Sequence, residues 1–166
     1  MTAPEPLFDE VRLQRLLVSQ RWAALGTLDD GVPYVSWVAF VLVSQPPGVA
    51  FHLSRLALHT RNLLADPNIS LALTEPDSGH VNPQQLARLS LQGLVQQVAR
   101  EASDYAGLRE CYLAKFPKAA PMFGFGDFDV FRFLPHRGRY VEGFGRTHEM
   151  EGEVLRGVIQ DAGHLS

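Results

Sequence analysis

The feature that most constrains the fold is an Asp-Gly turn between two segments rich in β-branched and aromatic residues. The segments 22–28 and 32–43 flank this turn at Asp30-Gly31. An Asp-Gly pair readily adopts the positive φ angles of a tight hairpin turn. A second turn at 45–48 leads into 49–53, which predicts three strands in antiparallel succession.

The rest of the chain alternates short helices with strands. Helices are expected over residues 9–20, 57–65, 103–115 and 119–123, and strands over 69–73, 86–98, 128–133 and 139–142. Asp9 and Ser103 are expected to cap helices, and Gly93 to mark a bulge. The order predicts a mainly β (α+β) fold, a six- to seven-stranded antiparallel barrel with helices packed outside. Residues 1–150 are expected to form this single domain, followed by a C-terminal tail, 151–166.

Composition excludes several classes of protein. With 15 Lys plus Arg against 18 Asp plus Glu, the net charge of −3 favours neither nucleic acid nor a membrane surface as partner. One cysteine, Cys111, allows no intrachain disulfide and no cysteine-cluster metal site. The six histidines lack zinc-peptidase spacing, so no metal site is expected. No signal peptide or membrane-spanning run is visible, which favours a cytoplasmic protein.

A candidate anion site lies between a strand end and a short helix. The segment 54–62 combines Ser54, His59, Thr60 and Arg61 with unpaired backbone N–H groups of the helix start. Such groups, together with an arginine fork, suit a phosphate. The alternative is that Ser54 caps the helix while the charged side chains are solvated.

Two weaker candidates lie further along the chain. Arg88, in the long strand, shares a face with alternate residues such as Ser90, where it either meets an acceptor or faces solvent. The segment 143–146, Gly-Phe-Gly-Arg, either lets the backbone approach a flat ligand or forms a flexible exit from the last strand.

These segments together resemble the FMN-binding split barrels, which include pyridoxamine 5'-phosphate oxidase and bacterial haem-degrading flavin-barrel proteins. The resemblance runs from about Phe8 to Thr147. It rests on the segments 24–28, 30–33, 53–54, 59–63, 66–71 and 87–93. The segments 125–132 and 140–145 resemble the haem-utilisation branch in particular.

The resemblance implies a split β-barrel homodimer with FMN at the subunit interface. Four groups of site residues are implied: Ser36, Trp37 and Val38 at the flavin ring; Ser54, His59, Thr60 and Arg61 at the phosphate; Arg88 on the long strand; and Tyr140, Gly143, Phe144 and Arg146 from the partner chain.

The function expected from this resemblance is that of an FMN-binding oxidoreductase with an unassigned small-molecule substrate. The Arg-x-His signature of pyridoxamine 5'-phosphate oxidase is replaced here by Gly145-Arg146-Thr147-His148, which argues against that activity. The alternatives are a haem-binding or haem-degrading protein with His148 or His164 as iron ligand, a non-catalytic flavin carrier or sensor, and an empty barrel that binds a protein partner.

Overall fold

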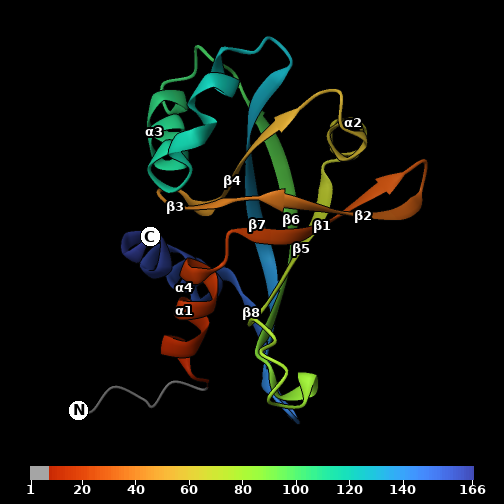
Figure 1. Ribbon diagram of the computed structural model, residues 1–166, viewed down its shortest axis with the longest axis vertical. Helices are drawn as coiled ribbons and strands as arrows, with labels where there is room; N and C mark the ends of the chain where they lie inside the picture. Colours follow the sequence, from red (N-terminus) through yellow and green to blue (C-terminus); the bar gives the residue numbers. More distant parts are fainter. Residues whose placement is uncertain (1–7) are drawn as a thin grey trace.

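An antiparallel sheet of eight strands carries the fold in the computed structural model, which describes residues 8–166 (Figure 1). The strands are β1 (Trp22–Asp29), β2 (Val32–Ala39), β3 (Val41–Ser44), β4 (Pro47–Ser54), β5 (Asn68–Thr74), β6 (Arg88–Val98), β7 (Phe128–Gly143) and β8 (Arg146–Glu151). The helices are α1 (Glu10–Ser19), α2 (Leu58–Ala65), α3 (Tyr105–Lys115) and α4 (Gly152–Leu165), with 3-10 segments η1 (Pro83–Gln85) and η2 (Pro117–Gly124). The predicted α+β split barrel is confirmed.

The sheet order is β2-β1-β5-β6-β7-β4-β3, and β8 pairs with β7 beside this path. The expected hairpin of β1 and β2 is present, with Asp29 opposite Val32. The third strand expected over 49–53 is present as β4, but it pairs with β3 and not with β2, because the run 32–43 breaks at the fully buried Phe40. Its two halves, β2 and β3, lie at opposite ends of the sheet order, which gives the barrel its split.

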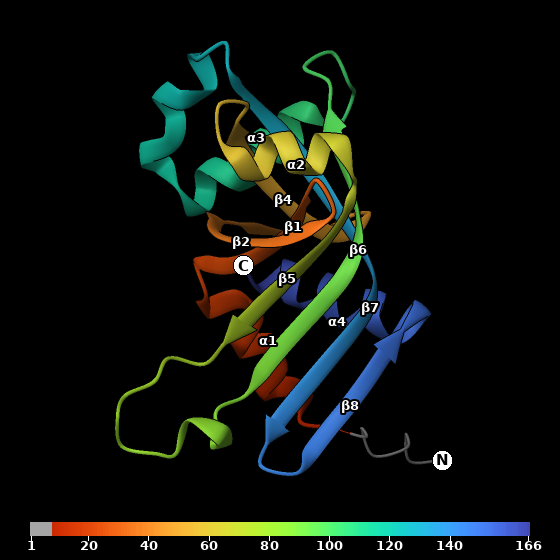
Figure 2. The ribbon, with the colours of Figure 1, turned by 90° about the vertical axis from the view of Figure 1, so that its right-hand side faces the viewer.

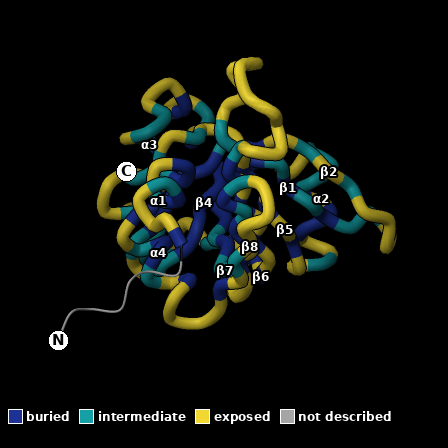
Figure 3. Tube along the Cα trace, turned by 90° about the horizontal axis from the view of Figure 1, so that it is seen from below, coloured by how far each residue is buried: buried dark blue, intermediate teal, exposed yellow. Residues whose placement is uncertain are grey.

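Two apolar clusters fill the fold. The larger one lies between the sheet and helices α1 and α4 and contains Phe51, Phe133 and Tyr140. The smaller one lies under α3 and η2 and contains Tyr112 and Phe123. Figure 3 shows the buried segments gathered around β4 at the centre and the exposed segments at the periphery. The helices therefore lie on both sides of the sheet, with α1 and α4 over one side and α3 and η2 over the other side at β3, β4 and the start of β7.

The tail expected after residue 150 forms structure that belongs to the core. Helix α4 buries Leu155, Val158, Ile159 and Ala162, a spacing of three and four residues that places them on one helix face. This face packs against α1, β3 and β4. Residues 151–166 are thus an integral part of the fold rather than an appendage.

Local details confirm some expectations and correct others. Asp9 caps α1, since its Oδ1 accepts from Arg12 N at 2.9 Å, and the pairing register of β6 shifts at Gly93 as expected for a bulge. Helix α3 starts after Asp104 rather than at the cap expected from Ser103. The two strands expected over 128–133 and 139–142 are one continuous strand, β7. Across the described residues, every helix is too short or too polar to cross a membrane.

Candidate functional site

One side of strands β5 and β6 faces solvent, whereas α3 and η2 cover the same side of the sheet at β3, β4 and the start of β7. Figure 2 shows strands β5 to β8 toward the viewer with α1 and α4 behind them. Residues along β5 and β6 alternate between exposed and buried, so one side of these strands packs on the core and the other meets solvent. We call the solvent side of β2, β1, β5, β6, β7 and β8 the outer face.

The strand register aligns small side chains across this face. Trp37 pairs with Ala24, and Ala24 pairs with Ala72. Ala72 then pairs with Ser90, and Ser90 with Arg139. Paired residues of antiparallel strands lie on the same side of the sheet. This row therefore runs from an exposed indole over a floor of small side chains to a guanidinium.

The neighbouring row has the same character. Val35 pairs with Gly26, Gly26 with Ser70, Ser70 with Gln92 and Gln92 with Arg137. A Cβ atom on Gly26 would lie 2.3 Å from the Ser70 Oγ atom, so a side chain at residue 26 would occupy the space above the floor. The glycine keeps the outer face open at this point.

Three adjoining depressions hollow the outer face. The largest, about 620 Å³, is lined by Trp22, Trp37 and Arg88 among others and by the loop after β5. The other two, of about 420 and 410 Å³, share Ser70 and Gln92. Trp22 and Trp37 are 58% and 63% exposed. Two large solvent-exposed indoles on one face indicate a surface that a ligand or another molecule covers.

Arginines border the floor opposite the indoles. Arg139 Nη1 lies 2.9 Å from Glu149 Oε1, and Arg137 Nε lies 3.4 Å from Glu149 Oε2. Arg88 has no carboxylate oxygen within 4.0 Å among residues 8–166. It is therefore the border arginine whose charge is free to meet an incoming anion.

An ion pair anchors the loop that follows β5 and lines the largest depression. Arg12 on α1 donates to both carboxylate oxygens of Glu75, with Nε to Oε1 at 2.6 Å and Nη2 to Oε2 at 2.5 Å. Glu75 Oε2 also accepts from Ala87 N at 2.8 Å, at the other end of the loop. The hydrogen bonds from Arg12 are the main reason that the pKa of Glu75 is lowered.

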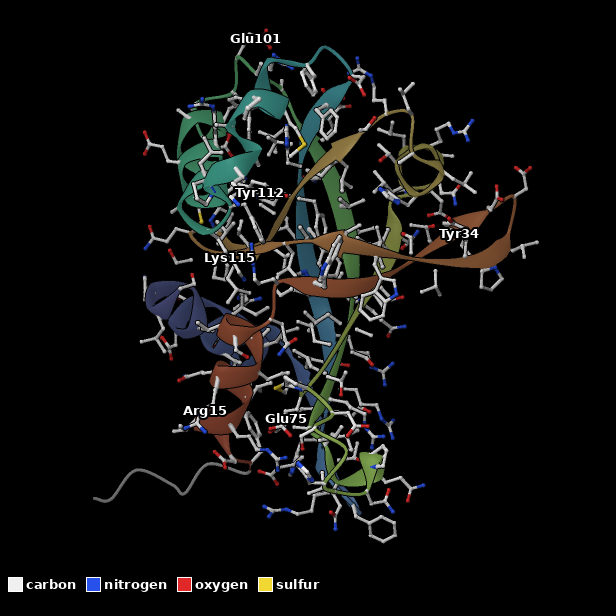
Figure 4. All side chains as sticks on the ribbon, in the orientation of Figure 1. Arg15, Tyr34, Glu75, Glu101, Tyr112 and Lys115 are labelled. Carbon is white, nitrogen blue, oxygen red and sulfur yellow. The ribbon has the colours of Figure 1, made fainter. Side chains whose placement is uncertain are left out.

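Replacing Glu75 with glutamine is expected to flatten the acid limb of the stability profile. The folded pKa of Glu75 lies below its ordinary value of 4.5, so the stabilisation is complete above that pH and is lost as pH falls through the folded value. Urea unfolding of the wild type should weaken more steeply between pH 5 and pH 3 than that of Glu75→Gln. Glu101→Gln, at the opposite end of the molecule in Figure 4, is the control. Parallel profiles for wild type and Glu75→Gln would contradict this role.

In the segment expected to bind phosphate, carboxylate groups already pair with the side chains of Ser54 and Arg55. Ser54 Oγ donates to Asp127 Oδ2 at 2.6 Å, and Arg55 Nη1 lies 2.6 Å from Asp129 Oδ2. Thr60 is fully buried, and the adjacent Arg61 is exposed. The side chains that were expected to converge on an anion are thus separated or already paired. The alternative role of Ser54 as a helix cap is also absent, because the N-cap residue of α2 is Ala57.

The remaining expected site residues divide between the core and the surface. Of the three on β2, Trp37 lies on the outer face, whereas Val38 is 2% exposed in the core and the Ser36 Oγ atom is buried without a hydrogen-bond partner among the described residues. Alternation along a strand sends neighbours to opposite faces. Burial lowers the pKa of His59, which lines none of the three depressions.

The four residues expected to come from a partner chain also divide between the core and the surface. Tyr140 is fully buried in the core of the single chain. Gly143 has a φ of 143° at the end of β7, and Phe144 is 77% exposed in the following turn. Arg146 pairs with the buried Glu142, Nε to Oε2 at 2.7 Å.

The histidines considered as iron ligands do not lie on the outer face. His148 pairs in register with Tyr140 on the core side and packs 5.6 Å from the Phe8 ring centroid. His164 lies in the last turn of α4.

Sequence reasoning missed His136, which lines one depression, and Trp22, which lines the largest. Alternation along β1 is the signal that would have found Trp22. In the part of the chain from Phe8 onward, no cluster of His, Cys, Asp and Glu has the geometry of a metal site.

Comparison with known proteins supplies the family. Residues 7–154 match the family described as CREG, beta-barrel. The chain is 33% identical over 133 residues to the non-canonical heme oxygenase HOZ of Arabidopsis thaliana, covering 80% of this chain and 39% of that protein. It is 26% identical over 170 residues to the heme oxygenase HutZ of Vibrio cholerae, covering 96% of this chain and 89% of HutZ.

A solved structure agrees in shape. The heme binding protein from Mycobacterium smegmatis superposes with a TM-score of 0.79 at 27% identity, over 95% of this chain and 62% of that one. The chain thus spans about two fifths of the Arabidopsis relative and under two thirds of the mycobacterial one. The expectation of FMN as cofactor is contradicted, because these relatives are named for heme. With its match over residues 7–154, the chain belongs to the CREG beta-barrel family.

Proposed function

We propose that this chain binds haem on its outer face. The observation that carries the proposal is the 620 Å³ depression in which Trp22, Trp37 and Arg88 meet over a floor of small residues. Haem is a flat apolar ring with two carboxylates, and the site offers a surface of matching chemistry. The relatives named as heme oxygenases and as a heme binding protein support the same ligand.

The residues present fit such a ligand. Ala24, Gly26 and Ala72 leave room for a flat ring, and a Cβ atom on Gly26 would intrude on that room. We assign the indoles of Trp22 and Trp37 to contact with the ring, because aromatic side chains supply large apolar area in binding sites. Arg88 is assigned to a propionate, for which a guanidinium fork provides parallel donors.

We assign His136 to the iron, because an imidazole nitrogen is a common iron ligand and this histidine lines a depression of the outer face. Bound haem supplies an iron that can react with O2. The chain would orient the ring, exclude water from one side and hold the propionates. The names of the relatives support oxidative opening of the ring as the reaction, with electrons from an external reductant. A visible spectrum of the complex that is the same in His136→Ala would remove His136 from this role.

We also propose that a second copy of the chain covers the outer face. Trp22, Val35 and Trp37 are each more than half exposed on it, and burying such side chains between subunits is favourable by about 25 cal/mol per Å² of apolar area. A homodimer would thereby close the haem site. Sedimentation equilibrium that shows a monomer with and without haemin would contradict the dimer and leave haem binding as a separate question.

Replacing Arg88 with alanine is expected to weaken haemin binding about tenfold, since a hydrogen bond to a charged group contributes about 1.5 kcal/mol or more. Titration followed by the haem absorption band measures the affinity. Arg61→Ala is the matched control, because Arg61 is an exposed arginine that lines none of the three depressions. Equal losses in both variants would mean that only general charge attraction is involved.

The complex of the protein with haem can also be used to test the proposed oxidative opening of the ring. Haem-loaded protein supplied with ascorbate and O2 should lose its haem absorption faster than free haemin does under the same conditions. A stable absorption band would assign the chain to haem binding without turnover and would leave the site itself intact.

A further inference from the structure

We propose that Lys115 is a reactive amine that takes small apolar aldehydes as a Schiff base, in a pocket separate from the outer face. The pocket has a volume of about 380 Å³ and is lined by residues of α1, β3, α3 and α4. Figure 4 shows Lys115 between helix α3 above and helices α1 and α4 below. The pocket shares no lining residue with the three depressions of the outer face, so the two sites do not compete.

The walls of this pocket select for an apolar ligand. Val18, Val41, Ala114 and Leu165 contribute hydrocarbon, and Lys115 is the lysine at the lining. The volume lies within the range of small-molecule sites, about 300–1,000 Å³. An aldehyde with a short hydrocarbon chain would bury that chain against these walls and present its carbonyl carbon to the amine.

Contacts hold the amine in place. Lys115 Nζ donates to Gln20 O at 2.7 Å and lies 4.6 Å from the centroid of the Phe40 ring. Burial, helped by the charge of Arg21, lowers the pKa of Lys115 to about 8. Lysines that are partly removed from water in this way are suited to serve as Schiff-base nucleophiles.

The neighbouring thiol does not compete for the ligand. Cys111 lies one helical turn before Lys115, and its Sγ donates to Leu42 O at 3.3 Å. Burial raises the pKa of this thiol, which keeps it in the weakly nucleophilic protonated form. The charged or titratable groups acting on the amine are thus Arg21 and Cys111.

The reaction needs no oxidant or metal. The Nζ lone pair forms a bond to the carbonyl carbon, and the carbonyl oxygen leaves as water with the two hydrogens from the amine. At pH 7.5, an amine of pKa about 8 is unprotonated in about a quarter of molecules, against about one in a thousand for an unperturbed lysine. This difference gives Lys115 the advantage over an exposed lysine.

The chain contains its own control, because its two lysines are Lys115 and the exposed Lys118. Butanal and limiting cyanoborohydride at pH 7.5 should alkylate Lys115 at least tenfold faster than Lys118, as read by peptide mass mapping. Glycolaldehyde, which is polar, should show a smaller preference. Equal or faster labelling of Lys118 would overturn the proposal.

A matched pair of variants supports the measurement. Lys115→Arg keeps the positive charge near Gln20 O but should remove the fast-labelling peptide, whereas Lys118→Arg should leave it unchanged. The labelling of wild-type protein decides the proposal by itself if Lys115→Arg does not fold. Haemin binding measured on the alkylated protein is expected to be unchanged, so this proposal can fail without affecting the proposed haem site.

Discussion

Replacing Trp37 with alanine is expected to weaken haemin binding about thirtyfold, the equivalent of about 2 kcal/mol for truncating an aromatic side chain that anchors a ligand. Trp37 sits at the end of the row of small residues and lines the largest depression. It is 63% exposed in the single chain, so its loss should leave the folded monomer intact. Haemin titration measures the change in Kd, and the thermal midpoint of the apo protein verifies the fold.

Leu56→Ala is the matched control for this loss. Leu56 is 79% exposed, lies in the turn before α2 and lines none of the three depressions. Both substitutions remove an exposed apolar side chain, and only one of them removes it from the outer face. A similar Kd for Trp37→Ala and Leu56→Ala would place haem elsewhere on the molecule or show that its binding is nonspecific.

Replacing Gly93 with alanine is expected to destabilise the fold by about 3 kcal/mol, because the added methyl group has to be forced into a closed space. A Cβ atom at this bulge would lie 2.2 Å from Leu134 O and 2.6 Å from Pro135 Cα. Both contacts are with backbone, which cannot rotate away as the end of a side chain does. Urea unfolding at neutral pH measures the change.

Gly107→Ala provides the opposite outcome in the same assay. Gly107 is an exposed residue of helix α3, and a Cβ atom there would meet nothing within 4 Å. Alanine should raise the free energy of unfolding by about 0.5 kcal/mol because it restricts the unfolded chain and favours helix. If both glycine substitutions shifted the unfolding midpoint alike, close packing at the bulge would not be what requires Gly93.

Most of the elements could be predicted from local sequence patterns, and the two main errors have physical causes. The run 32–43 reads as one strand because β propensity continues through Phe40, while the break there depends on which strands lie beside each half. Helix α4 was missed because its glycines suggested flexibility. Gly163 instead allows close packing, since a Cβ atom there would lie 3.2 Å from Ser44 N.

The residues that line the outer face are harder to predict than the fold because they come together through pairing between distant strands. Alternation along β6 sufficed to place Arg88 and Ser90 on one exposed face. The alignment of Trp37 with Ala72 and Ser90 runs through β1 and β5, and no local pattern specifies that register. The segment 54–61 is a plausible anion site locally, but Asp127 just before β7 and Asp129 on β7 lie at the same strand end and pair with Ser54 and Arg55.

The central claim, that haem lies on the outer face, is tested most directly by nuclear magnetic resonance of the tryptophan indole N–H groups. The chain has two tryptophans, Trp22 and Trp37, and both line the largest depression. Zinc protoporphyrin is a diamagnetic substitute for haem, and its ring current shifts protons strongly only at close range. We expect both indole resonances to move as one equivalent of zinc protoporphyrin is added, with Leu56→Ala behaving as the wild type. Saturable binding that leaves both indole resonances in place would contradict the account.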